Sequence, residues 1–287
     1  MKDQLIAAAA SIESHPGRLD DNLDRIGEAC RHAANLGAEL LLLPELSLTG
    51  FIPNHPRMEH ASWLAEALAG AWRMALPLQG LAVKRLIELA DRSGLLVATG
   101  FLETTGNTLF NTHVLAGNKR IYGAWRKMHI PMFETPFYNG GGAAEVVETP
   151  LGRIGVNICF DAFLPESTRL LALQNAEIAL FPFAADPAPV NADGWWEWAG
   201  PVVQARCAEN ALYGVAANCF GELNYAGVQQ TFGGGAAIVG PHGRVVQGPE
   251  DRMTATLLRH EELLDARAAF EYTLRFRRPE LYDLLTK

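Results

Sequence analysis

The sequence has no apolar run long enough to cross a membrane and no excess of positive charge. Its longest apolar stretches, around Leu40–Pro44 and Ile178–Phe183, are strand-sized, whereas a membrane-spanning helix needs about 20 apolar residues. The 24 Lys and Arg residues are outnumbered by 32 Asp and Glu residues, which gives a net charge of -8. Sequence-independent nucleic-acid binding needs a basic stripe. We therefore expect neither a membrane nor a nucleic acid as partner.

Cysteine is also scarce. The 287 residues include four cysteines (Cys30, Cys159, Cys207 and Cys219), too few for a disulfide framework in a chain of this length. The N-terminal segment has one lysine followed directly by Asp3, which makes a poor signal peptide. These features predict a cytoplasmic protein. The eight histidines include no pair with the helical spacing of metal ligands, and no metal site is predicted.

The sequence does contain an alternation of apolar strands and amphipathic helices, which predicts an α/β fold with helix-covered sheets. Strands are predicted at Gln4–Ile12, Ala38–Pro44, Leu95–Phe101, Thr108–Ala116, Arg120–Trp125, Ile154–Ile158, Ala176–Phe181, Tyr213–Cys219, Gly233–Val239 and Arg244–Gln247. Helices are predicted at Arg18–Asn35, Leu78–Arg92, Pro165–Gln174 and Trp195–Ala211. The strand that begins at Ala176 is expected to stop at Pro182, because proline lacks a backbone donor.

No internal repeat, low-complexity run or polar linker divides the chain. We therefore predict a single domain over residues 1–287, in which 253–287 forms a C-terminal tail of strand, short helix and basic extension. The segment Asp186–Trp196 is rich in Pro, Ala and Asp. It fits a surface loop near the site, either ordered or mobile.

Cys159 stands where the apolar run Ile154–Ile158 ends, a few residues before the predicted helix at Pro165. The positive end of a helix dipole favours a thiolate, which is the reactive form of cysteine. A lone cysteine more often packs as a small hydrophobic side chain. This residue taken alone therefore leaves a structural and a nucleophilic role open.

Glu45 and Lys127 occupy comparable positions, directly after a buried strand and after a predicted hairpin. Each fits an ordinary exposed charge when considered alone. However, α/β proteins build their sites at the carboxyl ends of buried strands. A carboxylate, an ammonium and a thiol together supply the base, the oxyanion donor and the nucleophile that amide hydrolysis needs, without a metal.

Three blocks in the expected order resemble the nitrilase superfamily of carbon–nitrogen hydrolases. They are Leu43-Pro-Glu45-x-x-x-Thr-Gly50-Phe51, Arg126-Lys127-x-His129-Ile-Pro131 and Gly155-x-x-x-Cys159-Phe-Asp161-x-x-x-Pro-Glu166. Further matches are Asn111 in a Phe-Asn-Thr block, Phe181-Pro182, Arg206-Cys-Ala-Glu209-Asn210, and Gly234-Gly235-Ala-Ala-Ile238 before Pro241-x-Gly243. The resemblance covers nearly the whole chain, and the order and spacing of its blocks make it specific.

The resemblance implies a role for each matching residue. Cys159 is expected to be the nucleophile, and Glu45 the general base that later acts as an acid. Lys127 and the backbone N–H of Phe160 are expected to stabilise the oxyanion. Glu134, shortly after Lys127, matches a second glutamate that holds the lysine or the substrate, although an exposed loop position is the alternative.

The resemblance also implies a four-layer α-β-β-α sandwich, no cofactor, and assembly into a homodimer or larger homo-oligomer. The tail at 253–287, with its basic cluster Arg275-Phe-Arg277-Arg278, is predicted to mediate that assembly. Two departures from the family pattern are present. Ala236 replaces a common serine, and Cys159-Phe-Asp161 replaces the Cys-Trp-Glu of true nitrilases, which favours the amidase-like branch.

The predicted function is therefore hydrolysis of a small amide or N-carbamoyl compound through a thioester, releasing ammonia or an amine and a carboxylic acid. Nitrile hydrolysis by the same residues remains an alternative. A catalytically silent subunit with a binding or assembly role is another, although intact Glu45, Lys127 and Cys159 argue against it.

Five aromatic residues are candidates for the wall of the substrate pocket, with core packing as the alternative. They are Phe137, Tyr138, Phe183, Trp195 and Trp196. Other side chains of the blocks fit structural roles. We expect His129 to be a hydrogen-bonding residue and Cys207 and Cys219 to be core residues. Arg206 and Glu209 are expected to pair with each other or across an interface.

Overall fold

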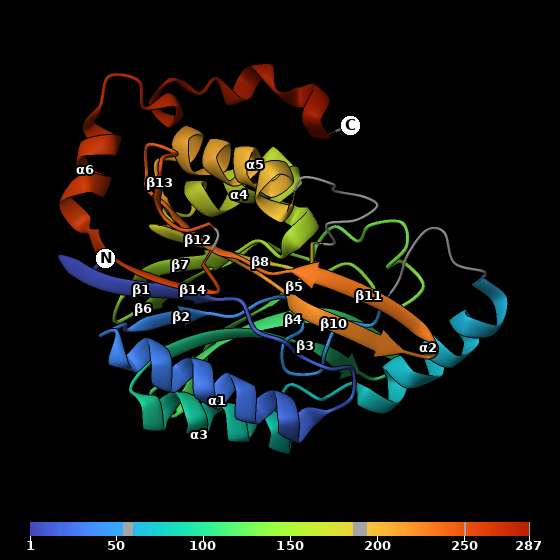
Figure 1. Ribbon diagram of the computed structural model, residues 1–287. Coiled ribbons are helices and arrows are strands. Elements are labelled where there is room, and N and C mark those ends of the chain that lie inside the picture. The colour runs from blue at the N-terminus through green and yellow to red at the C-terminus, as the bar shows by residue number, and fades with distance from the viewer. Residues whose placement is uncertain (54–59, 186–193, 250, 287) are drawn as a thin grey trace.

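The computed structural model describes residues 1–53, 60–185, 194–249 and 251–286. Two six-stranded sheets pack face to face, with helices on the outer side of each (Figure 1). The first sheet has the strand order β14-β1-β2-β3-β4-β5, and the second has β13-β12-β9-β8-β7-β6. A separate hairpin, β10-β11, extends to one side. The predicted α-β-β-α sandwich is confirmed.

The strands of the first sheet are β1 (Gln4–Ala10), β2 (Leu40–Leu42), β3 (Leu96–Thr105), β4 (Thr108–Gly117), β5 (Arg120–Arg126) and β14 (Met253–Arg259). Those of the second sheet are β6 (Val146–Thr149), β7 (Gly152–Val156), β8 (Ile178–Phe183), β9 (Tyr213–Asn218), β12 (Ala236–Val239) and β13 (Val245–Gln247). The side hairpin is β10 (Phe220–Tyr225) and β11 (Val228–Gly233).

The α-helices are α1 (Leu19–Asn35), α2 (His60–Met74), α3 (Leu81–Ser93), α4 (Pro165–Leu173), α5 (Trp195–Asn210) and α6 (His260–Ala268). Helices α1 and α3 cover the outer face of the first sheet, and α4 and α5 cover that of the second (Figure 1). Short 3-10 helices are η1 (Cys159–Phe163), η2 (Thr273–Phe276), η3 (Pro279–Leu281) and η4 (Asp283–Thr286).

Strand β1 shows why strand sequences in the first sheet are almost continuously apolar. Leu5, Ala7 and Ala9 face the second sheet, whereas Ala8 and Ala10 face α1 and α3. Successive side chains of a strand point to opposite faces, so a strand covered on both sides needs apolar residues at every position. The same alternation divides Leu40–Leu43 between the two layers.

Strand β8 continues through Pro182, which the sequence-based prediction placed beyond its end. The prediction was wrong because pairing with β7 reaches only Leu180. Leu180 O accepts from Asn157 N on that side, and Pro182 has the same orientation. A backbone N–H at position 182 would point past the end of β7, so the proline costs the sheet no hydrogen bond on that side.

Three further elements, α2, β6 and the β10-β11 hairpin, were not predicted. In helix α2, a Cβ added to Gly70 would stand 1.5 Å from the Tyr225 hydroxyl of β10, so the helix and the hairpin are in direct contact. Strand β6 is defined by its pairing with β7, and α2 and the hairpin by their contact with each other, rather than by a clean apolar periodicity of their own.

Part of the predicted C-terminal tail belongs to the first sheet. Strand β14 pairs antiparallel with β1 over seven residue pairs, from Gln4 opposite Arg259 to Ala10 opposite Met253. The chain after residue 259 then runs through α6 and lies over the helices of the second sheet (Figure 1). The tail residues that follow β14 lie outside the two sheets.

Candidate active site

Glu45 lies in the turn that follows β2 and is fully buried. Its Oε1 accepts hydrogen bonds from Lys127 Nζ at 2.8 Å and from Asn111 Nδ2 at 2.6 Å. Its Oε2 accepts one from the backbone N–H of Ala184 at 2.9 Å. The carboxylate is therefore fixed by three donors, one from within β4 and two from residues that directly follow β5 and β8, which is the arrangement that a positioned base requires.

Lys127 follows β5, and its side chain has no exposed surface. The ammonium contacts Glu45 at 2.8 Å and Glu134 Oε2 at 2.7 Å. Burial alone would lower the pKa of Lys127, but the negative charges of Glu134 and Glu45 raise it well above its ordinary value. The side chain is consequently a permanent buried cation.

Cys159 begins the 3-10 helix η1, three residues after β7 ends, and it is 7% exposed. Its φ of 49° is unusual for a residue with a side chain and marks a sharp turn. Burial, and then the charge of Glu45, raise the pKa of the Cys159 thiol well above its ordinary value, against the opposing charge of Lys127. Burial and the Glu45 carboxylate therefore oppose the thiolate that a helix end favours.

Glu134 is buried in the turn after β5, not exposed in a loop. Burial raises its pKa to about 7, while Lys127 lowers it and Glu45 raises it further. The Tyr138 hydroxyl hydrogen-bonds to the Glu134 side chain and stabilises its charged form. The structure thus places Glu45, Lys127, Glu134 and Cys159 in one buried cluster.

The backbone N–H of Phe160 donates no hydrogen bond within the described part of the chain. It lies in the first turn of η1, next to the Cys159 thiol. The Phe160 ring stacks on Phe163, with ring centroids 6.1 Å apart. An unpaired N–H at this point is available as a donor to an oxyanion.

The five aromatic candidates are all buried or partly buried. Phe137 packs edge-on against Trp63 and next to Tyr138, in the core cluster that also contains Leu46. Phe183 packs against Trp195, whose ring contacts Trp196 with centroids 5.0 Å apart. These contacts assign each ring a packing role. Contact with substrate stays a prediction for all five.

Most of the segment Asp186–Trp196, predicted as a surface loop, lies outside the described residues. Its last three residues are described, and Trp195 begins helix α5. The predicted structural roles elsewhere are confirmed. His129 bonds to Asp161, Arg206 pairs with Glu209 at 3.1 Å, and Cys207 and Cys219 are buried.

Two groups of the cluster were not identified as site residues from the sequence. Asn111 appears in one of the recognised blocks, but nothing in the sequence shows that its amide reaches Glu45. The Ala184 N–H bonds to Glu45 and also hydrogen-bonds to Cys159. Because this donor is a backbone group, no side-chain pattern could reveal it.

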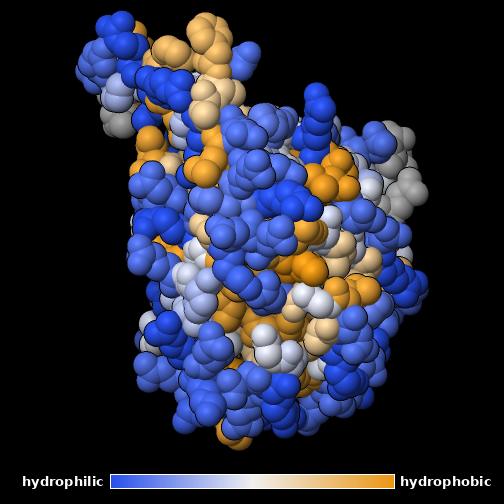
Figure 2. Space-filling view, turned by 90° about the vertical axis from the view of Figure 1, so that its left-hand side faces the viewer, coloured by the Kyte–Doolittle hydropathy of each residue, from blue (hydrophilic) through white to orange (hydrophobic). Residues whose placement is uncertain are grey.

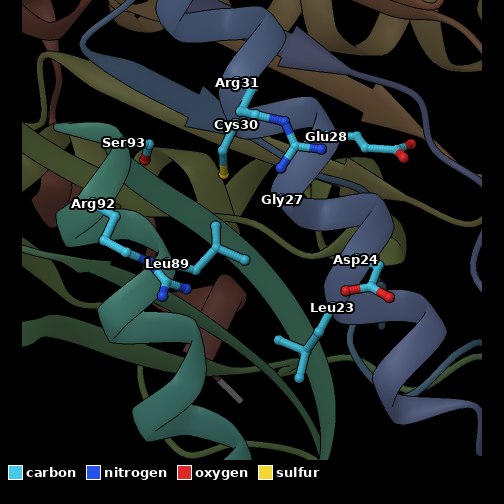
Figure 3. A pocket seen from close by; sticks show the side chains of 9 residues that line it. All are labelled: Leu23, Asp24, Gly27, Glu28, Cys30, Arg31, Leu89, Arg92 and Ser93. Carbon is cyan, nitrogen blue, oxygen red and sulfur yellow. The ribbon is translucent and has the colours of Figure 1, made fainter.

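A surface groove of about 510 Å³ lies between α1 and α3, on the far side of the first sheet from Cys159 (Figure 3). Cys30 lies at its base, and the charged side chains of Asp24, Glu28, Arg31 and Arg92 line it. Burial raises the pKa of Cys30 to about 12, which disfavours the reactive thiolate form.

Within residues 1–53, 60–185, 194–249 and 251–286, no group of three or more His, Cys, Asp or Glu side chains is arranged to hold a metal ion. No helix in these ranges is both long and apolar enough to cross a membrane.

Comparison with known proteins agrees with this geometry. Residues 6–266 match the carbon-nitrogen hydrolase family. The chain belongs to this family, and it is a carbon–nitrogen hydrolase. It is 29% identical to a nitrilase of Pyrococcus abyssi over 74% of this chain and 75% of that protein. It is 30% identical to an N-carbamoylputrescine amidase of Arabidopsis thaliana, over 71% and 72% of the two chains.

The fold is shared with solved structures of the family. A carbon-nitrogen hydrolase from Helicobacter pylori superposes with a TM-score of 0.82, at 21% identity, over 99% of both chains. At this identity the likeness supports the α-β-β-α fold and does not identify a substrate.

Proposed function

We propose that this carbon–nitrogen hydrolase cleaves a small amide or N-carbamoyl compound through a thioester on Cys159. The observation that carries the proposal is the fully buried Lys127 ammonium, held between Glu45 and Glu134 beside the Cys159 thiol. A buried cation flanked by two carboxylates has a large desolvation cost, which a purely structural role does not require.

In the first half of the reaction, Glu45 takes the thiol proton while Cys159 Sγ attacks the carbonyl carbon. The carbonyl oxygen becomes an oxyanion, stabilised by the Lys127 ammonium and the Phe160 N–H. The C–N bond then breaks, and the proton held by Glu45 moves to the leaving nitrogen. Ammonia or an amine departs, and the acyl group remains on the sulfur.

In the second half, Glu45 removes a proton from water, which attacks the thioester carbonyl. The C–S bond breaks, the acid leaves, and the proton returns to the thiolate. Burial and the Glu45 charge raise the pKa of the Cys159 thiol, which supports a mechanism in which a base takes its proton. Cytoplasmic localisation belongs to the proposal, since a reducing compartment keeps this thiol free.

Nitrile hydrolysis is the second candidate, and similarity to the Pyrococcus abyssi nitrilase favours it. Similarity to the Arabidopsis thaliana N-carbamoylputrescine amidase supports the amide or N-carbamoyl class. The Cys159-Phe-Asp161 sequence also favours the latter class, because true nitrilases commonly have Cys-Trp-Glu at this point.

The test is intact-mass spectrometry after incubation with amides, N-carbamoyl amino acids and nitriles, with ammonia release measured in parallel. We expect the wild type to gain the mass of an acyl group, and Cys159→Ala to lose at least about a thousandfold in rate. Cys207→Ala, which removes a buried core thiol, is the matched control and should keep its activity. Hydrolysis retained by Cys159→Ala contradicts the proposal, as does a wild type inert to the whole panel.

We also propose that the enzyme is a homodimer or larger homo-oligomer. Apolar side chains are exposed on α4, α5 and the C-terminal residues, including Leu170, Leu173, Trp198, Phe276 and Leu284. Figure 2 shows the C-terminal extension standing out above the rest of the surface, with apolar and polar side chains mixed. Exposed apolar groups of this size are typical of association surfaces.

A further inference from the structure

The thiol and the ammonium of the candidate site are carried by different sheets. Lys127 follows β5 at the edge of the first sheet, whereas Cys159 follows β7 in the second. No strand pairing joins β5 to β7. Something other than sheet register must therefore fix the distance between these two groups, and catalysis depends on that distance to within about 1 Å.

Asp161 supplies the connection. Its carboxylate accepts from Ile158 N at 3.2 Å, next to Cys159 in sequence. It also accepts from His129 N at 2.9 Å and from Met128 N at 3.2 Å, the two residues that follow Lys127. A single buried side chain thus binds both segments directly beside the two reacting groups.

His129 completes the arrangement. Its Nδ1 lies 2.8 Å from Asp161 Oδ1, while its ring is 43% exposed. The hydrogen bond to Asp161 raises the pKa of His129, with smaller contributions from the charges of Asp161 and of Glu166 on α4. The imidazole therefore stabilises a carboxylate that is otherwise held by backbone donors alone.

We propose that Asp161 and His129 form a positioning pair that sets the separation between the Lys127 ammonium and the Cys159 thiol. The inference rests on the proposed function, because that separation matters only if one transition state uses both groups. Neither residue touches the reacting atoms. Loss of the pair should misplace the oxyanion donor relative to the nucleophile and leave the thiol itself intact.

Two thiol reagents separate these effects. Iodoacetamide carries an amide carbonyl, and its reaction forms an S–C bond, expels iodide and transfers the thiol proton to Glu45 or solvent. Methyl methanethiosulfonate has no carbonyl and forms a disulfide with loss of methanesulfinate. The measured quantity is the iodoacetamide rate divided by the methyl methanethiosulfonate rate at Cys159, obtained by peptide mass spectrometry. This rate ratio reports how well the carbonyl of iodoacetamide is held while sulfur attacks the neighbouring carbon.

We expect Asp161→Asn to lower this rate ratio at least about tenfold, because its NH₂ group cannot accept from the facing N–H donors. His129→Ala should lower it less. His129→Asn, which keeps a donor near the position of Nδ1, should restore most of the loss. With a hydrolysed substrate, kcat should fall with the ratio while KM changes less than about threefold. His242→Ala, an exposed histidine in the β12–β13 turn, is the control.

The inference is overturned if folded Asp161→Asn and His129→Ala keep the wild-type rate ratio. It is also overturned if both reagents lose rate equally at Cys159. If Asp161→Asn does not fold, the His129 pair of variants decides. Lys127→Gln separates the positioning role of Asp161 and His129 from the oxyanion role of Lys127. If Lys127→Gln lowers the rate ratio but the Asp161 and His129 variants leave it unchanged, only the proposal of a positioning pair is wrong. If Lys127→Gln keeps the wild-type kcat on a hydrolysed substrate, the oxyanion role in the proposed function fails as well.

Discussion

At the scale of single residues, the candidate site depends on how Glu45 is held. Both of its oxygens are occupied by donors, from Asn111, Lys127 and the backbone of Ala184. Hydrogen bonds to an ionised carboxylate are stronger than neutral ones, so these donors fix the position of the Glu45 side chain firmly. Asn111 is the one donor of the three that is a neutral side chain.

Replacing Asn111 by Asp should impair the base. A second carboxylate within about 3 Å of Glu45 disfavours two negative charges together, so protonation becomes easier. We expect kcat/KM at pH 7 to fall about tenfold to a hundredfold and the acidic limb of its pH profile to move to higher pH. Asn224→Asp, on the exposed face of β10, should leave the profile in place. If the acidic limb of the Asn111→Asp profile stays at the wild-type pH, the role of Asn111 in supporting the base is contradicted.

The stability of the protein should depend on pH through Glu134. The raised pKa of about 7 in the folded state exceeds the ordinary value of 4.5, so the folded chain binds more protons between these values. The contribution of this group to the free energy of unfolding is therefore full below pH 4.5 and declines as the pH rises through 7. Urea titrations at pH 5 and 7.5 should show a smaller decline for Glu134→Gln than for the wild type.

How much of the site could be predicted differs from one residue to the next. Glu45, Lys127 and Cys159 each follow a readable apolar segment, so their positions at strand ends could be predicted. Their mutual contacts, and the raised pKa of the thiol, depend on burial that a linear sequence does not contain. The contact of Asn111 with Glu45 could not be predicted either, because Asn111 lies inside β4, where an amide side chain has no periodic signature.

At the scale of elements, small residues let helices approach the sheets closely. On β9, a Cβ added to Gly214 would stand 2.5 Å from Cys207 Sγ of helix α5 and 3.3 Å from the Phe181 ring. The helix therefore rests on the strand at a point where no side chain fits. Periodic patterns predicted both elements, but the contact between them was not predictable.

Gly214→Ala should destabilise the protein by about 1–3 kcal/mol, because the added methyl overpacks this contact. Cys207→Ala removes the opposing sulfur, so the double variant should lose less than the sum of the two single losses. Chemical denaturation of all four chains measures the coupling. Strict additivity would show that the backbone shifts to absorb the methyl group and that the contact is not a constraint.

At the scale of the whole molecule, the residues after 252 have two separable roles. Strand β14 completes the first sheet beside β1, and Leu263 and Ala266 of α6 are buried in contact with the body. The residues after α6 are largely exposed, including Phe270 and Leu284. The first part therefore belongs to the fold, and the second is available for assembly.

A chain that ends at residue 268 should fold, with its melting temperature lowered by no more than a few degrees, and should sediment as a smaller species than the full chain. A chain that ends at residue 252 should not fold, since it lacks the partner of β1 along its whole length. Analytical ultracentrifugation and circular dichroism test both. An unchanged mass for the 268-residue chain would assign assembly to α4 and α5 alone.

The pairing of β1 with β14 also has a consequence for biosynthesis. Residues 4–10 leave the ribosome early, yet their partner strand ends at Arg259. At roughly 5–20 residues per second, translation leaves the edge of β1 open for about 12–50 s in each nascent chain. An open edge of small apolar residues is a template for association with other chains. Newly made chains should therefore be most vulnerable to aggregation, and most dependent on chaperones, until this last strand is in place.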